Sequence, residues 1–166
     1  MRKIGLLLTC LVMVLTTKAQ DHDWAFGFYG DVQLKAPNYN GAFGIQGKYD
    51  FTAHSAAQAQ VYGRHGYVAA GLDYLFSLLD KEQSNFNIFL GAGYSQDFYK
   101  YNEFSGEIVI PERRENHSIA NGQLGVSYYF PEVNVSVYAG YKAKYNFDWD
   151  EFNPNFVMFG LRYHLW

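Results

Sequence analysis

The sequence predicts an all-β fold, an eight-stranded antiparallel up-and-down transmembrane β-barrel. Three observations predict this class: apolar and polar residues alternate in eight segments, no helix-period segment interrupts them, and short turns alternate with mostly longer loops. Successive side chains of a strand point to opposite faces, so each segment has an apolar and a polar face. The predicted strands are residues 24–35, 41–51, 56–64, 67–78, 86–101, 118–130, 133–147 and 155–166.

The first nineteen residues are predicted to be a cleavable secretory signal. Arg2 and Lys3 precede the apolar run IGLLLTCLVMVL, and the small residues Thr17 and Ala19 predict cleavage after position 19. The run is shorter than the roughly 20 residues that a spanning helix needs. A transmembrane helix and a lipoprotein signal ending at Cys10 are the weaker alternatives.

Composition limits the functions open to the remaining domain, residues 20–166. Cys10 leaves with the signal, so the mature chain has no disulfide, thiolate ligand or cysteine nucleophile. Loss of the three basic residues of the signal changes the net charge from −3 to −6, which argues against a nucleic-acid partner. The 15 Tyr, 14 Phe and 16 Gly suit β-structure with a large aromatic surface.

The first four predicted strands show the alternation clearly. In residues 24–35, Trp24, Phe26 and Phe28 share one face, and in residues 41–51, Phe43 and Ile45 do the same. The opposite faces of these four strands carry the polar residues Asp31, Lys48, Asp50, Gln58, Gln60, Arg64 and Asp73. The connections TAHS and GRH are short enough to join antiparallel neighbours.

The last four strands repeat the pattern. The segment VNVSVYAGYKAKYNF is the longest clean alternation in the chain, and it places Lys142 and Lys144 on its polar face. The polar faces of the other three carry Asn87, Asp97, Asn121, Gln123 and Arg162. LDKEQSN and FPEV form short turns, whereas residues 102–117 and the segment DWDEFNPN form longer loops.

Side-chain size predicts which face points outward. An eight-stranded barrel has an interior just wide enough for side chains, and nearly every strand Phe lies on the apolar face. The polar face holds the glycines Gly27, Gly44, Gly71, Gly91, Gly93, Gly125, Gly140 and Gly160. We therefore expect a polar interior and an apolar exterior. The alternative is a secreted lipocalin-like binder, with the apolar face inside.

Aromatic residues also gather at two depths, as expected for the two interfaces of a membrane. The set near the short turns is Trp24, Phe51, Phe76, Phe86 and Phe130. The set near the longer loops is Tyr39, Tyr99, Tyr101, Tyr145, Phe147 and Trp149.

These features resemble the small eight-stranded outer-membrane barrels of Gram-negative bacteria, of the OmpX and OmpA transmembrane-domain type. The final segment FVMFGLRYHLW resembles their C-terminal strand, although Trp166 lies one place out of phase with Leu165. The resemblance implies location in the cell outer membrane, termini in the periplasm and longer loops outside. It also implies contact with outer-membrane lipid and lipopolysaccharide, and with the barrel-assembly machinery during biogenesis.

Charged residues on the inward face are expected to form a network in the lumen. They are Asp31, Lys48, Asp50, Arg64, Asp73, Asp97, Lys142, Lys144 and Arg162. Isolated buried charge is very costly, so ion pairs and hydrogen bonds should plug the barrel. A narrow ion or proton path is the alternative, whereas an open channel needs about sixteen strands.

The loop of residues 102–117 is the candidate extracellular interaction site. Its residues Glu107, Ile108, Val109, Ile110, Arg113 and Arg114 combine an apolar run with paired arginines. The first expectation is a solvated loop that merely connects the two strands. The functional interpretation is a protruding hairpin whose exposed edge invites a surface protein through strand addition, and OmpX-like proteins are similar in having such strands. Arginine contacts with lipopolysaccharide phosphate are a further alternative.

No enzyme activity, cofactor or metal is predicted. An outer-membrane lipid-modifying enzyme of the lipid A deacylase or acyltransferase type is the alternative, but His117 and Ser118 are adjacent and point to opposite faces. The acidic residues Asp148, Asp150 and Glu151 lack the glycine of a calcium loop. They are expected to be solvated.

Overall fold

The computed structural model describes residues 24–35, 39–81, 84–101, 104–105, 108–109 and 113–165. The predicted signal, and Glu107 and Ile110 of the candidate loop, lie outside these residues. Eight strands close a barrel: β1 (Trp24–Gln33), β2 (Asn40–Asp50), β3 (Ser55–Arg64), β4 (Tyr67–Ser77), β5 (Phe86–Tyr101), β8 (Arg113–Phe130), β9 (Val135–Asn146) and β10 (Glu151–His164). β6 (Phe104–Ser105) and β7 (Ile108–Val109) form a separate two-stranded sheet.

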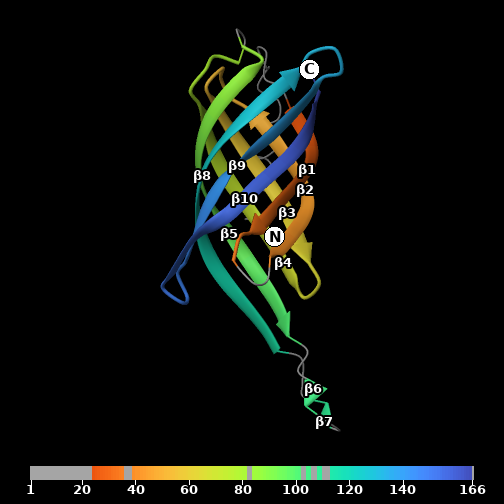
Figure 1. The fold of residues 1–166 in the computed structure, drawn as a ribbon, viewed down its shortest axis with the longest axis vertical. Helices are drawn as coiled ribbons and strands as arrows, with labels where there is room; N and C mark the ends of the chain where they lie inside the picture. The colour runs from red at the N-terminus through yellow and green to blue at the C-terminus, as the bar shows by residue number, and fades with distance from the viewer. Residues whose placement is uncertain are drawn as a thin grey trace, which may run out of the picture.

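All barrel neighbours are antiparallel, and each strand pairs with the next barrel strand along the chain. β1 also pairs with β10, from Ala25 opposite His164 to Gln33 opposite Phe156, which closes the sheet. The predicted fold is thus confirmed. Figure 1 shows the barrel with the C-terminus at the upper end, where the short turns lie, and β6 and β7 below the lower end. Within the described ranges, no helix is long and apolar enough to cross a membrane.

The apolar face points outward, as predicted. Phe28, Ile45 and Leu72 are 69%, 65% and 60% exposed, although they are large apolar residues in regular strands. Their neighbours on the other face, such as Gln46 and Asp73, are buried. The arrangement is the inverse of a lipocalin-like barrel, in which the apolar face lines the interior.

The interior contains larger side chains than the size argument suggests. Tyr29, Tyr62 and Tyr138 are buried inside. Glycines make room for them, because a Cβ at Gly44 would collide with the Cα of Tyr62, and one at Gly160 with the hydroxyl of Tyr138. Small residues therefore line the interior in order to admit a few large ones.

Several strand ends differ from the prediction by one or more residues, and three of these differences have a structural cause. β8 starts at Arg113, five residues early, because the chain continues to pair with β5 beyond the rest of the barrel. β10 starts at Glu151, and its register shifts between Asn153 and Phe156, around Pro154, which has no N–H to donate. β9 starts two residues late, since Asn134 adopts a φ of 53° in the preceding turn.

β5 and β8 form a hairpin that extends past the other strands at the lower end of the view in Figure 1. Their pairing continues to Tyr101 opposite Arg113, whereas the pairing of β8 with β9 ends at Ile119 opposite Asn146. β5 and β8 thus protrude together beyond the rest of the barrel. The tip of this hairpin differs from the expectation, since the segment of Ile108 and Val109 pairs with β6 and does not continue β8.

Candidate functional site: the polar lumen and the protruding hairpin

Eight of the nine charged residues that were assigned to the lumen are buried there. They are Asp31, Lys48, Asp50, Asp73, Asp97, Lys142, Lys144 and Arg162. Arg64 lines the mouth of the lumen at the loop end but is not buried. It is exposed at the end of β3, and its guanidinium carbon lies 5.5 Å from the ring centre of Tyr67.

The centre of the lumen is organised around the Asp73 carboxylate. Lys142 Nζ lies 3.4 Å from Asp73 Oδ2, and neither side chain is accessible to solvent. Gln60 Nε2 and Gln123 Nε2 donate to the same oxygen at 2.8 and 3.2 Å. A buried carboxylate is tolerated here because cationic and neutral donors converge on it.

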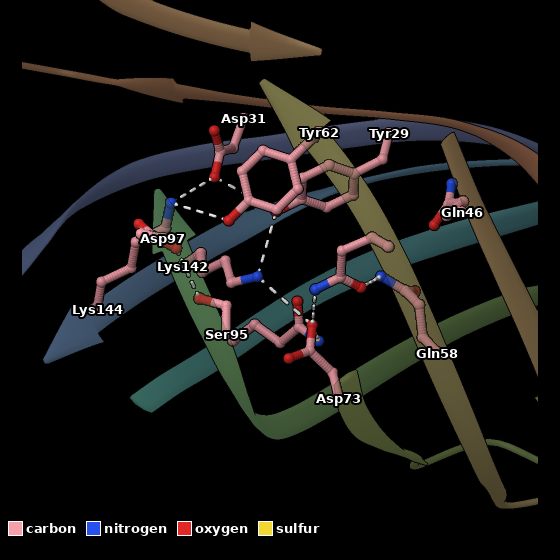
Figure 2. A network of polar contacts seen from close by, with 12 residues as sticks. Tyr29, Asp31, Gln46, Gln58, Tyr62, Asp73, Ser95, Asp97, Lys142 and Lys144 are labelled. Atoms are coloured by element: carbon pink, nitrogen blue, oxygen red, sulfur yellow. Dashed lines mark hydrogen bonds and ion pairs between the residues drawn. The ribbon is translucent and has the colours of Figure 1, made fainter. Parts of the chain in front are cut away.

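A second ion pair lies toward the loop end. Lys144 Nζ donates to Asp31 Oδ2 at 2.7 Å and to the Tyr62 hydroxyl at 3.2 Å. Lys142 Nζ also donates to the Tyr29 hydroxyl at 3.2 Å, and that hydroxyl donates to Asp31 at 3.4 Å. Figure 2 shows that these contacts join the two ion pairs into one network.

Arg162 extends the network toward the short-turn end. Its Nε donates to Gln46 Oε1 at 3.3 Å, its Nη2 donates to Gln58 Oε1, and its guanidinium lies 3.9 Å from the centre of the Tyr138 ring. Gln58 in turn donates to Gln60 at 3.0 Å. Side chains thus connect across the lumen from Arg162 to the Lys142–Asp73 pair.

The carboxylate of Asp50 accepts from two lysines near the short-turn end. Lys48 Nζ lies 2.5 Å from Asp50 Oδ2, and Lys81 donates to Oδ1. Sequence reasoning missed Lys81 because it belongs to the turn between β4 and β5. Alternation assigns a face only within a strand.

Asp97 accepts its hydrogen bonds from neutral hydroxyl groups, whereas each of the other buried carboxylates contacts a lysine. The Tyr67 hydroxyl donates to Asp97 Oδ2 at 2.8 Å, and Ser95 donates to Asp97 Oδ1 at 3.1 Å. Tyr99 packs on Tyr67, with ring centres 4.9 Å apart, and is partly buried. Tyr99 was predicted to belong to the outer aromatic belt, but it belongs to the lumen.

Two cavities flank this network. The loop-end cavity has a volume of about 450 Å³, and its lining includes Asp97, Lys144 and Trp149. The short-turn cavity has a volume of about 470 Å³, and its lining includes Lys48 and Arg162. The hydrogen-bonded side chains between them come from strands all around the barrel.

The hairpin presents an open strand edge. The Ser118 N–H donates to Asp148 Oδ2 at 2.7 Å, and its carbonyl accepts from the Phe147 N–H at 3.0 Å. Backbone groups two residues apart in a strand point to the same side, so those of Asn116 and Arg114 also point away from β5. β9 ends at Asn146, so no barrel strand within the described residues covers this edge.

His117 and Ser118 lie on opposite faces, as expected. The His117 ring is buried against Trp149, with ring centres 4.2 Å apart, and lies 3.6 Å from Glu115 and 3.7 Å from Asp148. Ser118 Oγ accepts from the Tyr94 hydroxyl at 2.9 Å on the outer surface. No hydrogen bond joins the imidazole to the serine hydroxyl.

Two acidic side chains of the loop between β9 and β10 accept hydrogen bonds from other residues of the protein. Asp148 accepts from the Ser118 N–H, and Asp150 accepts from the Tyr145 hydroxyl. Among the residues that the structure describes, no three His, Cys, Asp or Glu side chains are grouped as metal ligands.

A closed antiparallel barrel of eight strands with an apolar exterior and a polar lumen is the fold of small outer-membrane barrels. The sequence of this chain matches no protein-family model and no curated protein. Among solved structures, the N-terminal β-barrel domain of Pseudomonas aeruginosa OprF aligns with a TM-score of 0.68 at 16% identity, over 89% of this chain and 100% of that one.

A second similar structure is Ail, the attachment invasion locus protein of Yersinia pestis, in complex with the heparin analogue sucrose octasulfate. It aligns with a TM-score of 0.51 at 12% identity, over 87% of this chain and 97% of that one. The resemblance seen in the sequence is therefore confirmed at the level of the fold.

Proposed function

We propose that this protein is an outer-membrane barrel that acts at the cell surface through its β5–β8 hairpin, without catalysis. The observation that carries the proposal is the open edge of β8 beyond the end of β9. A strand edge with unpaired N–H and C=O groups is a template for an incoming strand. The partner is a surface protein that adds a strand along this edge, at the backbone of Asn116.

The apolar exterior supports the outer-membrane location. A lipid bilayer offers no hydrogen bonds to the backbone, and a closed barrel pairs its backbone groups internally. The exposed side chains along the strands are the kind that lipid favours, including Phe28, Ile45 and Leu72. With the short turns in the periplasm, the hairpin projects from the cell.

The lumen is proposed to be a structural plug and not a conduit. The support for this is the chain of contacts from Arg162 through Gln58 and Gln60 to Asp73 and Lys142. An ion would have to displace paired buried groups in order to pass, and each displacement would leave a charge without its partner.

Ail, described as an attachment invasion locus protein, gives support from another barrel of this fold. At 12% identity, the comparison supports only the statement that a barrel of this fold can occur in a protein described in this way.

Protease treatment of intact cells tests location and orientation together. Trypsin should cut at Arg113 or Arg114 in the protruding part of the hairpin, while the parts of the strands within the membrane remain protected until detergent dissolves it. The R113Q/R114Q variant, which lacks both sites, is the control and should lose the peptides that end at these two positions. Recovery of the uncleaved protein in the soluble periplasm or the medium would contradict the proposal.

Asn116→Pro tests strand addition. Proline removes the N–H that faces the open edge and is tolerated on edge strands, so the barrel should fold while partner binding falls. Asn116→Ala is the matched control, since it removes the side chain and keeps the N–H. Equal cross-linking of both variants to surface proteins would exclude recognition through this edge.

The catalytic alternative has a separate test. Deletion of the gene should leave lipid A acylation unchanged in mass spectra. A shift of one acyl chain would favour a lipid-modifying enzyme.

A further inference from the structure

The cavity at the short-turn end has an excess of positive charge, unlike the rest of the lumen. Among the residues that the structure describes, its lining includes Lys48, Lys81 and Arg162 against one carboxylate, that of Asp50. We propose that this cavity is a binding site for an oxyanion of the phosphate class, either free phosphate or a phosphomonoester. Its volume of about 470 Å³ leaves room for either.

The charge imbalance is local. In the loop-end cavity, Asp31, Asp97 and Glu151 are matched by Lys35, Arg64 and Lys144. At the short-turn end, both lysines contact Asp50, and the described partners of Arg162 are neutral glutamines and a tyrosine ring. A buried guanidinium that contacts no carboxylate among the described residues favours an anion nearby.

Strand register explains why the cations gather there. Lys48 and His164 both lie opposite Ala25, on either side of it, so three inward positions form one row across β2, β1 and β10. In the next row, Gln46 and Arg162 flank Gly27 in the same way. Ala25 and Gly27 are the residues of β1 in these two rows. Because they have small side chains or none, the part of the lumen beside β1 has space for the longer side chains of β2 and β10.

The lining also supplies neutral groups suited to phosphate oxygens. It includes the hydroxyls of Thr52, Ser77 and Ser127. The hydroxyls of Ser84, Tyr129 and Ser136 also line the cavity but bond to Phe86, Asn134 and His164. Asn87 is buried in the same lining, and its Oδ1 has no hydrogen-bond partner among the described residues. A monoprotonated phosphate carries both acceptor oxygens for the lysines and one P–OH donor. Asn87 Oδ1 is closed off from solvent, so it accepts this proton only when its side chain turns toward the cavity. Chloride and sulfate offer no such donor.

Calorimetric titration tests the site. The full chain is folded in dodecyl maltoside with about 0.15 M sodium chloride and titrated with inorganic phosphate. We expect one phosphate per barrel, and affinity at least about tenfold weaker in the K48Q/K81Q variant, because each lysine contributes a charge-assisted hydrogen bond. Lys35→Gln is the control, since it removes one lysine charge at the loop-end cavity, away from this site, and should bind normally.

Three results would overturn the proposal: no binding by the unmodified protein, equal binding by K48Q/K81Q, or equal displacement by sulfate. Circular dichroism of each variant shows whether the barrel has folded, and Lys81→Gln alone, in the turn, serves if the double variant does not fold. Glycerol 3-phosphate, titrated in parallel, separates the two sources. Tighter binding than inorganic phosphate identifies a phosphomonoester, and weaker binding identifies free phosphate.

Discussion

Lys142 of β9 and Asp73 of β4 form an ion pair across the middle of the barrel, with Nζ 3.4 Å from Oδ2 and both side chains fully buried. The two residues lie 69 positions apart in the sequence. Such a pair is favourable only while both partners are present, because both charges lost their hydration when the barrel closed. This property leads to the first prediction.

Lys142→Met should lower the free energy of unfolding by about 3–5 kcal/mol, since it leaves the Asp73 carboxylate buried without a cation. The double variant K142M/D73L should recover most of the loss, because it removes both charges. Urea titration in lipid vesicles, followed by tryptophan fluorescence, measures both. Lys35→Met, at an exposed site, is the control. Equal destabilisation by the single and double variants would show that the pair is not coupled.

Gly27→Ala should destabilise the barrel by about 1–3 kcal/mol, because backbone atoms cannot move aside as side chains do. The added Cβ would collide with the Leu161 carbonyl and lie 2.8 Å from the Cα of Arg162. Gly122→Ala is the matched control, since its Cβ would meet no atom within 4 Å. The same urea titration should show little change for Gly122→Ala, or a gain of up to about 1 kcal/mol.

Leu72→Arg should destabilise the barrel by about 2–4 kcal/mol in vesicles, because the residue lies at the middle of β4 on the apolar exterior. Leu34→Arg, just beyond the end of β1, should cost about 1 kcal/mol or less. The diagnostic result is a larger loss of stability for the arginine at the middle of the strand than for the one near its end. Two equal and small effects would mean that water, and not lipid, surrounds the barrel.

The reconstituted protein should show no stable conductance steps in planar bilayers, because side chains fill the lumen between its two cavities. A Tyr62→Ala and Lys142→Ala double variant should conduct, since it removes two of the largest fully buried side chains. Arg64→Ala, at the exposed rim, serves as the control and should stay closed. Steady conductance by the unmodified barrel would support the ion-path alternative.

The strands and their faces could be predicted almost completely from the sequence. Alternation is a local property, so the neighbouring residues in the sequence are enough to predict which face of the sheet Phe28 and Asp31 point to. Strand ends were less predictable. The additional length of β8 depends on β5 as its partner, and the bulge near Pro154 depends on pairing with β9.

The lumen was predicted as a set of residues but not as a set of contacts. Sequence showed that Asp73 and Lys142 face inward, but their pairing depends on which strands lie across the barrel. Lys81 was missed because a turn residue has no alternating pattern. Arg64 was assigned to the network because its face is correct, yet its position at the end of β3 leaves it exposed.

The sequence alone therefore determined the all-β class, the eight barrel strands and the outward apolar face, because each follows from side-chain order along the chain and the width of a small barrel. Only the tertiary structure decided the ion pairs, the open edge of β8 and the cationic cavity at the short-turn end. Those features depend on register and closure, which bring together residues as distant as Lys48 and Arg162.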